Sequence, residues 1–326
     1  MVNAYRARRS CLAVPASSER FLARARDLPA DEVFLDLEDA VAPGAKDAAR
    51  RNAVAALTAG TWRAGVRAVR INDATTPWAY RDAVAVAEGA AGAVDVIVLP
   101  KVTGPDHVVW LDVLLGQIEQ AGEQRAARRI GIEAQIEDAG GLAAVDAIAA
   151  ASDRLEALVF GPADFMASIG MRSLDVGARP EGYAGDAFHY ALMRMLVAAR
   201  AHGLQAIDGP YLKIRDIDGF RRAAASAAAL GFDGKWVLHP GQIDAANEVF
   251  TPSQADYDRA EHILDAYQHA TTVDQRGAVM LGDEMIDEAS RKMALGLAAK
   301  GRAAGLKPTG APAPGTERAG PERAGS

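Results

Sequence analysis

The chain is poor in the residues that build disulfide-stabilised, metal-thiolate or membrane proteins. Cys11 is the only cysteine among 326 residues, which excludes an internal disulfide and a cysteine-based zinc framework. No apolar run approaches the roughly 18 residues that a membrane-spanning helix needs, and the start of the chain lacks the apolar stretch of a signal peptide. With a net charge of −7, the composition gives no indication of a basic surface for nucleic acid or for acidic lipids. We therefore expect a cytoplasmic protein that binds neither nucleic acid nor membranes.

What the sequence does contain is a regular alternation of short β-branched runs with longer alanine-rich segments of helical period. Alternation of this kind predicts a parallel sheet, and eight repeats favour closure into a (β/α)8 barrel. An open doubly wound sheet is the alternative, but the first strand is followed by Pro15-Ala-Ser-Ser and not by a glycine-rich dinucleotide loop. The predicted strands are Cys11–Val14, Glu32–Leu37, Arg67–Ile71, Val94–Leu99, Ile130–Gln135, Ala157–Phe160, Leu204–Ile207 and Lys235–Leu238.

Helical sequence follows each predicted strand, with clear examples at Lys46–Thr58, Val108–Gln120, Leu142–Ala151, Phe188–His202 and Ile217–Leu230. A further helix is predicted at about Gln254–His269.

These patterns divide the chain into three parts. We expect the barrel at residues 9–272, a C-terminal extension at 273–306, and a tail at 307–326 rich in Pro, Gly, Ala and charge, which should be disordered. The segment Met171–Gly185 is long for a loop of such a barrel, and we interpret it as a candidate cover for the active site.

Polar residues follow almost every predicted strand. In a (β/α)8 barrel the active site lies at the C-terminal ends of the strands, so these side chains should converge on one rim. They are Asp36, Glu38, Asp39, Arg70, Asn72, Lys101, Glu137, Asp138, Asp164, Asp208 and His239.

Two of these acids, Glu137 and Asp164, end the predicted neighbouring strands five and six. Two carboxylates, completed by waters and substrate oxygens, suit Mg²⁺, and nothing in the chain supplies the soft ligands that zinc prefers. The competing interpretation is that both residues cap the helices that follow them. The spacing alone does not decide between these interpretations.

Three basic groups on the same rim have a structural and a chemical interpretation. Arg70 suits a carboxylate or a developing enolate oxygen, although a salt bridge with Asp36 or Glu38 is the simpler expectation. Lys101 resembles a Schiff-base nucleophile, but the nearby carboxylates should keep it charged. His239 is a candidate base, and a hydrogen-bonded rim residue is the simpler interpretation.

The chain resembles the HpcH/HpaI aldolase and citrate lyase β-subunit family over about residues 9–305, and within it the malyl-CoA/β-methylmalyl-CoA lyases. The resemblance depends on the order of several blocks along one barrel. These are Leu35-Asp-Leu-Glu-Asp-Ala-Val-Ala-Pro with Lys46, Val69-Arg-Ile-Asn, Leu99-Pro-Lys, Gln135-Ile-Glu, Phe160-Gly-Pro-Ala-Asp-Phe, Asp208-Gly-Pro, Gly231-Phe-Asp-Gly-Lys-Trp-Val-Leu-His-Pro and Gly282-Asp-Glu-Met-Ile-Asp.

The resemblance assigns roles to residues already suspected and to one that spacing does not reveal. Glu137 and Asp164 match the family's magnesium ligands, with Mn²⁺ as an alternative, and Arg70 matches the arginine at the substrate's reacting oxygens. Asp287 matches a catalytic aspartate that the C-terminal segment delivers to a neighbouring subunit. This implies a homotrimer or homohexamer. The acidic motif of the second strand, Asp36, Glu38 and Asp39, should support the site from its edge.

Two positions depart from the family's usual pattern. Asp138 stands where many relatives have Thr or Ser, and it either supports the site or caps the next helix. The first loop reads Ala16-Ser-Ser-Glu-Arg, where many relatives have Gly and an arginine that meets the phosphates of CoA. We interpret Arg20 as the residue that takes over that contact.

The resemblance implies a Mg²⁺-dependent lyase that acts on a carbon–carbon bond. Its substrate would be a short 3-hydroxyacyl-CoA such as L-malyl-CoA, β-methylmalyl-CoA or citramalyl-CoA, and its products an acyl-CoA and glyoxylate or pyruvate. Three alternatives remain: a malyl-CoA thioesterase, a carrier-dependent subunit like the citrate lyase β chain, and an aldolase of free 2-oxo acids.

Overall fold

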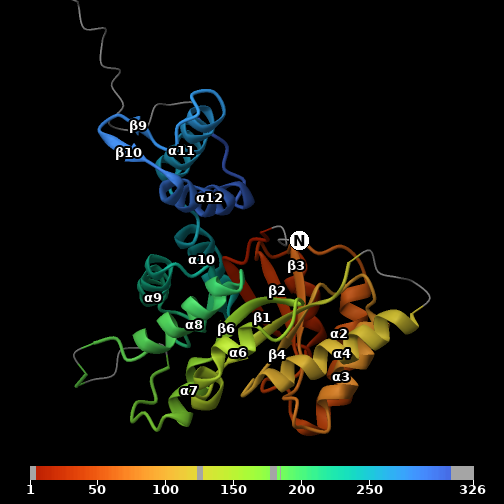
Figure 1. Ribbon diagram of the computed structural model, residues 1–326. Coiled ribbons are helices and arrows are strands. Elements are labelled where there is room, and N and C mark those ends of the chain that lie inside the picture. Colours follow the sequence, from red (N-terminus) through yellow and green to blue (C-terminus); the bar gives the residue numbers. More distant parts are fainter. Residues whose placement is uncertain (1–4, 123–127, 177–181, 184, 310–326) are drawn as a thin grey trace, which may run out of the picture. The chain divides into compact units, whose positions relative to one another are not determined.

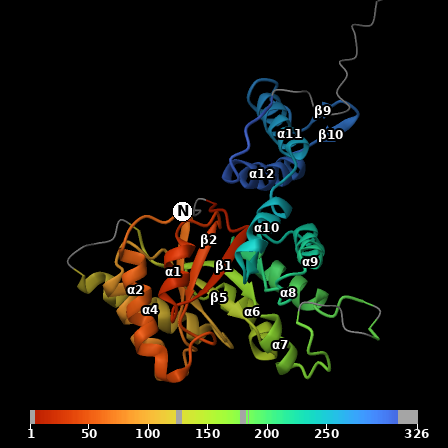
Figure 2. The same cartoon turned by 180° about the vertical axis from the view of Figure 1, so that it is seen from behind.

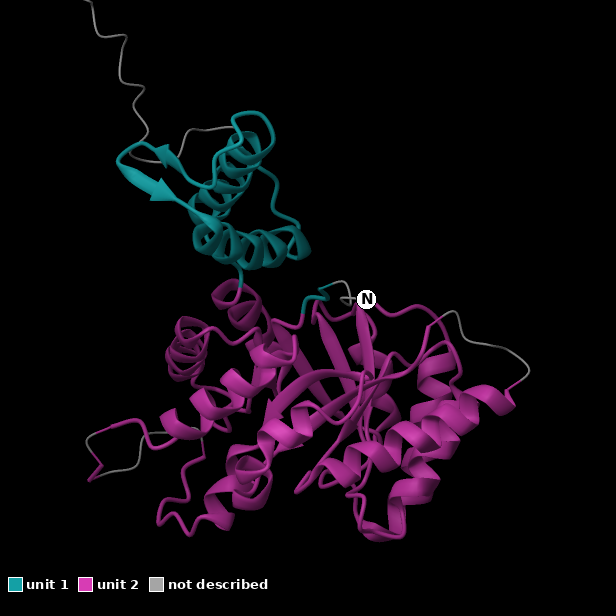
Figure 3. Ribbon diagram, viewed as in Figure 1, with its two compact units in different colours: residues 1, 3–7, 251–326 teal, residues 2, 8–250 magenta. Residues whose placement is uncertain are grey.

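The computed structural model describes residues 5–122, 128–176, 182–183 and 185–309. The expected disorder of the tail falls mainly on 310–326, outside the described residues, as does part of the candidate cover at Met171–Gly185. The chain forms two compact units, residues 2 and 8–250, and residues 1, 3–7 and 251–326 (Figure 3).

The larger unit is a closed barrel of eight parallel strands in sequential order, with helices around its outside (Figures 1 and 2). The (β/α)8 prediction is thus confirmed. The strands are β1 Ser10–Pro15, β2 Glu32–Asp36, β3 Val66–Arg70, β4 Val96–Leu99, β5 Gly131–Ile136, β6 Leu155–Phe160, β7 Gln205–Asp208 and β8 Gly234–Val237.

Each strand boundary lies within two residues of the sequence-based prediction, and two helices match it at both ends. The helices of this unit are α1 Glu19–Ala25, α2 Lys46–Thr58, α3 Ala79–Gly89, α4 Pro105–Ala121, α5 Ala139–Ala143, α6 Val145–Ala149, α7 Pro162–Ser168, α8 His189–Ala201, α9 Ile217–Leu230 and α10 Ile243–Val249. Short 3₁₀ turns lie at η1 Pro43–Ala45 and η2 Pro240–Gln242.

One helix was predicted wrongly. The single helix expected at Leu142–Ala151 is two short helices, α5 and α6, separated at Ala144, whose backbone (φ −95°, ψ 5°) leaves the α-helical region. The periodicity of apolar residues continues through the break, so a pattern of hydrophobic positions alone does not reveal it.

The barrel interior is layered because alternate residues of each strand point inward. On β2, Phe34 packs in a central apolar layer with residues such as Val98, Val159 and Trp236. Glu32 and Asp36 lie two residues to either side of Phe34 on the same strand, and both are buried. The interior therefore carries charge above and below an apolar middle, and the upper charged layer coincides with the C-terminal ends of the strands.

The smaller unit pairs helix α11 Gln254–Thr272 with helix α12 Glu288–Ala303, and a two-stranded sheet, β9 Val279–Leu281 and β10 Glu284–Ile286, joins them. Tyr257 of α11 packs against Ala294 and Ala298 of α12. Helix α11 was expected to belong to the barrel at residues 9–272, whereas its apolar face lies against α12. None of the described helices is long and apolar enough to cross a membrane.

Candidate active site

The site begins with an ion pair that the strand register creates. Asp36 of β2 lies opposite Arg70 of β3. Arg70 donates from Nε to Oδ1 of Asp36 at 2.8 Å and from Nη2 to Oδ2 at 2.7 Å. Burial acts to raise the pKa of Asp36, but the guanidinium outweighs it and lowers that pKa. The salt bridge expected for Arg70 is therefore present, and it orients the guanidinium plane.

Arg70 is held from two further directions. Its guanidinium carbon lies 5.2 Å from the ring centroid of Trp236, in cation–π range, and Nη1 lies 3.1 Å from Oε2 of Glu38. Burial acts to lower the pKa of Arg70, but these carboxylates outweigh it, so the pKa is raised. Asp36 occupies two of the five N–H donors of the guanidinium, which leaves the others for Glu38, Gln135 and a substrate.

The acidic loop after β2 is fastened by Lys46, the first residue of α2. Its ammonium donates to the backbone carbonyls of Leu37 at 2.8 Å and Glu38 at 2.7 Å. Asp36 also accepts from the amide of Glu38 at 2.9 Å. These bonds fix the backbone that presents the Glu38 carboxylate, and burial raises the pKa of that carboxyl group.

Glu137 follows β5 and is buried, with 2% of its surface exposed. Its Oε1 accepts from the backbone amide of Lys101 at 2.7 Å, and its Oε2 accepts from the side-chain amide of Gln135. Burial, with the nearby charge of Glu38, raises the pKa of Glu137 to about 8. Glu137 makes no helix cap, because Asp138 caps α5 by accepting from the amide of Gly141. The helix-cap interpretation of Glu137 is therefore wrong, and the helix-cap interpretation of Asp138 is confirmed.

Asp164 lies in the first turn of α7, whose N-cap is Gly161, and its side chain is half exposed. Lys101 connects it to the other acids. The ammonium of Lys101 lies 4.0 Å from Oδ2 of Asp164, within 3.2 Å of Asp39, and in contact with Glu38. Burial acts to lower the pKa of Lys101, but Glu38 and the other carboxylates outweigh it and raise that pKa, as expected of a lysine that forms no Schiff base.

The residues present fit a divalent cation with oxygen ligands. Glu137 and Asp164 would supply carboxylate oxygens, the type of ligand that Mg²⁺ prefers. No group of three His, Cys, Asp or Glu side chains in the described part of the chain is arranged to hold a metal by itself. Two carboxylates with open positions for water and substrate are what Mg²⁺ uses in catalytic sites.

Two further predicted residues belong to other elements of the chain. Asp287 belongs to the smaller unit, where it is the N-cap of α12 and accepts from the amides of Ala289 at 2.9 Å and Ser290 at 3.0 Å. Arg20 is an exposed residue of α1 whose guanidinium lies 5.1 Å from the ring of Phe21. Its contact with CoA stays a prediction.

His239 has the simpler of its two predicted roles. It is the N-cap of the η2 turn, and its Nδ1 accepts from the amide of Gly241 at 3.0 Å. It is thus a hydrogen-bonded rim residue.

Two residues that shape the site, Gln135 and Gly161, were not among the predicted site residues. Gln135 lies between Arg70 and Glu137 and bonds to both. Gly161 packs against Glu137, where an added Cβ would lie 2.4 Å from Cβ and 2.5 Å from Oε2 of that residue. Inward alternation along β5 places Gln135 on the same face as Glu137 and could have identified it.

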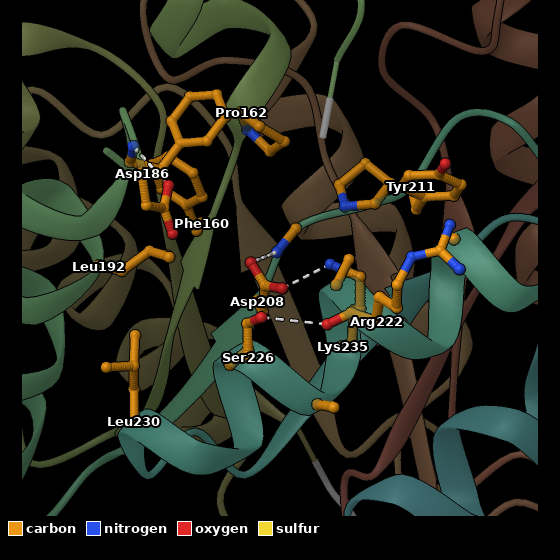
Figure 4. Close-up of a pocket in the computed structure, with 17 residues that line it drawn as sticks. Phe160, Pro162, Asp186, Leu192, Asp208, Tyr211, Arg222, Ser226, Leu230 and Lys235 are labelled. Atoms are coloured by element: carbon orange, nitrogen blue, oxygen red, sulfur yellow. Dashed lines mark hydrogen bonds and ion pairs between the residues drawn. The ribbon is translucent and has the colours of Figure 1, made fainter. Parts of the chain in front are cut away.

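Two of the cavities lined by described residues of the barrel unit lie near the C-terminal ends of the strands. The larger, about 680 Å³, opens between α8, α9 and β7, and Figure 4 shows the ion pair of Asp208 with Lys235 on its wall. None of the predicted catalytic or metal-binding residues lines it. The smaller, about 440 Å³, is lined by Glu38, Asp39 and Lys101. The smaller cavity therefore adjoins the acidic cluster.

Comparison with known proteins identifies relatives along most of the chain. Residues 9–240 match the model of the family described as HpcH/HpaI aldolase/citrate lyase. The L-malyl-CoA/β-methylmalyl-CoA lyase of Rhodobacter capsulatus is 40% identical over 289 residues, which cover 86% of this chain and 90% of that protein. The (3S)-malyl-CoA thioesterase of Cereibacter sphaeroides is 36% identical over 274 residues, covering 84% and 88%.

A solved structure extends the similarity to three dimensions. The CitE protein of Mycobacterium tuberculosis, in complex with magnesium, acetoacetate and coenzyme A, superposes with a TM-score of 0.69 at 30% sequence identity. The match covers 92% of this chain and 99% of that one.

Proposed function

The chain belongs to the HpcH/HpaI aldolase/citrate lyase family, and on that premise we propose that it is a Mg²⁺-dependent lyase of short 3-hydroxyacyl-CoA thioesters. It cleaves or forms the carbon–carbon bond of L-malyl-CoA, β-methylmalyl-CoA or citramalyl-CoA. Cleavage gives acetyl-CoA or propionyl-CoA together with glyoxylate or pyruvate, and the reverse reaction condenses them. A reducing compartment such as the cytoplasm suits the single thiol, Cys11.

The observation that carries the proposal is the meeting of Arg70, Glu137 and Lys101 at the C-terminal ends of β3, β5 and β4, with Asp164 within 4.0 Å of the Lys101 ammonium. This is the rim at which barrel enzymes bind substrate. Glu137 and Asp164 would hold the divalent cation. When bound, that cation supplies Lewis-acid polarisation of the substrate's carboxylate and hydroxyl oxygens.

Cleavage requires transfer of the hydroxyl proton to a base such as water, formation of the carbonyl of the 2-oxo acid as the carbon–carbon bond breaks, and transfer of that bond's electron pair to the thioester, which becomes an enolate. Arg70 presents N–H donors to the negative charge, and stabilisation of developing charge is commonly the largest catalytic contribution. Asp287 then gives a proton to the enolate carbon, or removes one in the condensation direction. The cavity beside Glu38, Asp39 and Lys101 offers a route by which the substrate reaches these groups.

We place Asp287 in the site of a neighbouring subunit, as the family resemblance implies. The active form is then a homotrimer or homohexamer. Asp287 belongs to a compact unit separate from the barrel, which suits its delivery to another chain.

The test is a product assay on the purified chain. Incubation with Mg²⁺, acetyl-CoA or propionyl-CoA, and glyoxylate or pyruvate should give a hydroxyacyl-CoA of matching mass, and EDTA should abolish its formation. The second candidate function is a malyl-CoA thioesterase, which the similarity to a thioesterase favours. Malyl-CoA as substrate distinguishes the two, because a lyase releases glyoxylate and a thioesterase releases free malate. Activity on a soluble CoA ester excludes dependence on a carrier protein. Absence of all products would refute the proposal.

A further inference from the structure

Lys101 occupies a backbone conformation that needs an explanation. Its φ of 51° is left-handed, and among the described residues it shares a positive φ with only one other non-glycine residue, Gln275. This conformation is strained for an L-residue, and such strain concentrates at functional sites. The surrounding structure must therefore compensate at this position.

Contacts of both the backbone N–H and the side-chain ammonium of Lys101 stabilise this conformation. The backbone N–H of Lys101 donates to Oε1 of Glu137 at 2.7 Å. Its ammonium contacts Glu38, lies 3.2 Å from Oδ2 of Asp39, and lies 4.0 Å from Oδ2 of Asp164. One residue thus touches both proposed metal ligands, one through its main chain and the other through its charge.

The charges of this cluster are unbalanced. Five carboxyl groups meet here, and among the described residues two side-chain cations, Arg70 and Lys101, contact them, while the charge of a third, Lys46, also acts on Asp36, Glu38 and Asp39. The carboxyl groups are Asp36, Glu38, Asp39, Glu137 and Asp164. Like charges repel strongly away from bulk water, so the cluster depends on its few cations, and the Lys101 ammonium lies against three of the carboxyl groups.

We propose that Lys101 is a positioning residue that acts as the internal counter-cation of this acidic cluster. Without a divalent cation, its ammonium holds Glu38, Asp39 and Asp164 together. When the cation binds at Glu137 and Asp164, the ammonium withdraws from Asp164 and keeps Glu38 and Asp39. The side chain has room to move, because it is 30% exposed. This inference rests on the proposed metal site.

The positive charge of Lys101 stabilises the acidic cluster without metal, and it also repels an incoming divalent cation. Lys101→Met removes the charge at similar side-chain length and leaves the backbone N–H in place. Lys101→Arg keeps the charge. Lys213→Met, which removes an exposed cation 3.2 Å from Asp175, is the control for the loss of a lysine elsewhere in the barrel.

The experiment compares these proteins after removal of metal with EDTA, by thermal unfolding and by calorimetric titration with Mg²⁺. We expect metal-free Lys101→Met to unfold at a lower temperature than wild type. Saturating Mg²⁺ should restore most of the difference, and the dissociation constant for Mg²⁺ should fall by about tenfold, as loss of one nearby positive charge implies. Lys101→Arg and Lys213→Met should follow wild type.

Mg²⁺-induced stabilisation of Lys101→Met that equals or falls below that of wild type would overturn the inference. A Lys101→Met protein that stays unfolded both with and without Mg²⁺ would also overturn the inference. A Lys101→Met protein that folds only when Mg²⁺ is added would support the inference. If wild type itself binds no Mg²⁺, the proposed function fails. The counter-cation role is then still tested, since it requires Lys101→Met to be less stable than Lys101→Arg without metal.

Discussion

Asp36 and Arg70 face each other across neighbouring strands and form a buried two-point ion pair, with N–O distances of 2.8 and 2.7 Å. The pair fixes the plane of the guanidinium, and the ring of Trp236 lies 5.2 Å from the guanidinium carbon. Planar alignment of this kind decides which donors remain free to meet a substrate.

Asp36→Asn tests the importance of this alignment. The amide keeps an oxygen for the backbone N–H of Glu38 but loses the charge that orients Arg70, which should turn toward Glu38. We expect kcat/KM to fall by about 10–100-fold, the usual effect of losing a supporting contact. The free energy of unfolding should fall by about 3 kcal/mol, because the buried guanidinium loses one of its two carboxylate partners.

The matched control is Asp95→Asn, which weakens another arginine–aspartate contact of the barrel, that of Arg67 and Asp95 at 2.9 Å. Asp95 precedes β4, at the opposite end of the barrel from Arg70. Steady-state kinetics and urea denaturation of both variants give the comparison. Equal activities of the two variants would show that the alignment of Arg70 has no catalytic effect.

Gly161→Ala tests the position of Glu137. The added methyl group would lie 2.4 Å from Cβ of Glu137 and 3.0 Å from Nε2 of Gln135, so the glutamate must shift. Because the backbone of Gly161 (φ −107°) suits alanine, the effect comes from this contact alone. We expect Mg²⁺ affinity to fall by at least about tenfold and the free energy of unfolding to fall by about 1–3 kcal/mol.

Calorimetric titration with Mg²⁺ measures the first effect. Gly44→Ala is the control, because a Cβ there meets nothing within 4 Å. Unchanged Mg²⁺ binding in Gly161→Ala would remove Glu137 from the metal site.

Much of the barrel follows from local sequence patterns. Alternation of apolar residues and the turns between segments locate all eight strands to within two residues, because these features depend on neighbours along the chain. The motif residues Arg70 and Glu137 were also placed correctly on the rim. The site itself depends on closure of the barrel. The link from Lys101 to Glu137 and Asp164 joins residues whose separation is set by register and strand number.

The charged layer toward the N-terminal ends of the strands was not predicted, because it also depends on closure of the barrel. Glu32 of β2 and Glu133 of β5 are far apart in sequence and are both buried beside Arg8, to which each is ion-paired. Gln205 accepts a hydrogen bond from Nη1 of Arg8, and Glu156 pairs with its Nη2. Each acid occupies a strand position that reads locally as polar, and only the closed barrel shows that they share one cation.

This layer predicts a pH dependence of stability. Burial, then the charge of Glu133, raises the pKa of Glu32 well above its usual value, with Arg8 acting in the opposite direction. Cys11 and Glu156 are the other titratable groups that lie around Arg8. A carboxyl group with a raised pKa binds its proton more tightly in the folded than in the unfolded chain. Its contribution therefore weakens as the pH rises from the unfolded pKa of 4.5 toward the folded value.

Glu32→Gln should remove this dependence, because its amide keeps an oxygen for Arg8 and replaces the carboxyl proton with an N–H. We expect near-equal stability to wild type at pH 5 and a relative gain at pH 9, up to about 1.4 kcal/mol per pH unit within the titration range. Chemical denaturation between pH 5 and 9 measures it. The exposed Glu88→Gln should keep the wild-type slope, and an unaltered slope in Glu32→Gln would contradict the interpretation.

The delivery of Asp287 to a neighbouring subunit is tested by mixing two inactive variants. Asp287→Asn should fold normally, since asparagine caps helices as well as aspartate does, but it cannot exchange a proton with the enolate carbon. Asp216→Asn, at the N-cap of α9, is the control for replacing a capping acid and should stay active. Glu137→Gln should fold and lose Mg²⁺ binding. Each of the two site variants alone should show almost no lyase activity.

Co-expression of Asp287→Asn and Glu137→Gln with different affinity tags yields mixed oligomers. If each site combines the barrel of one chain with Asp287 of another, about a quarter of the sites in a random mixture contain both intact residues. The mixed oligomers should then recover about a quarter of the wild-type activity in the product assay. If Asp287 acts on the barrel of its own chain, no site is intact and mixing recovers nothing. Light scattering on the wild type provides the second measurement, because a fully active monomer is incompatible with a site shared between chains.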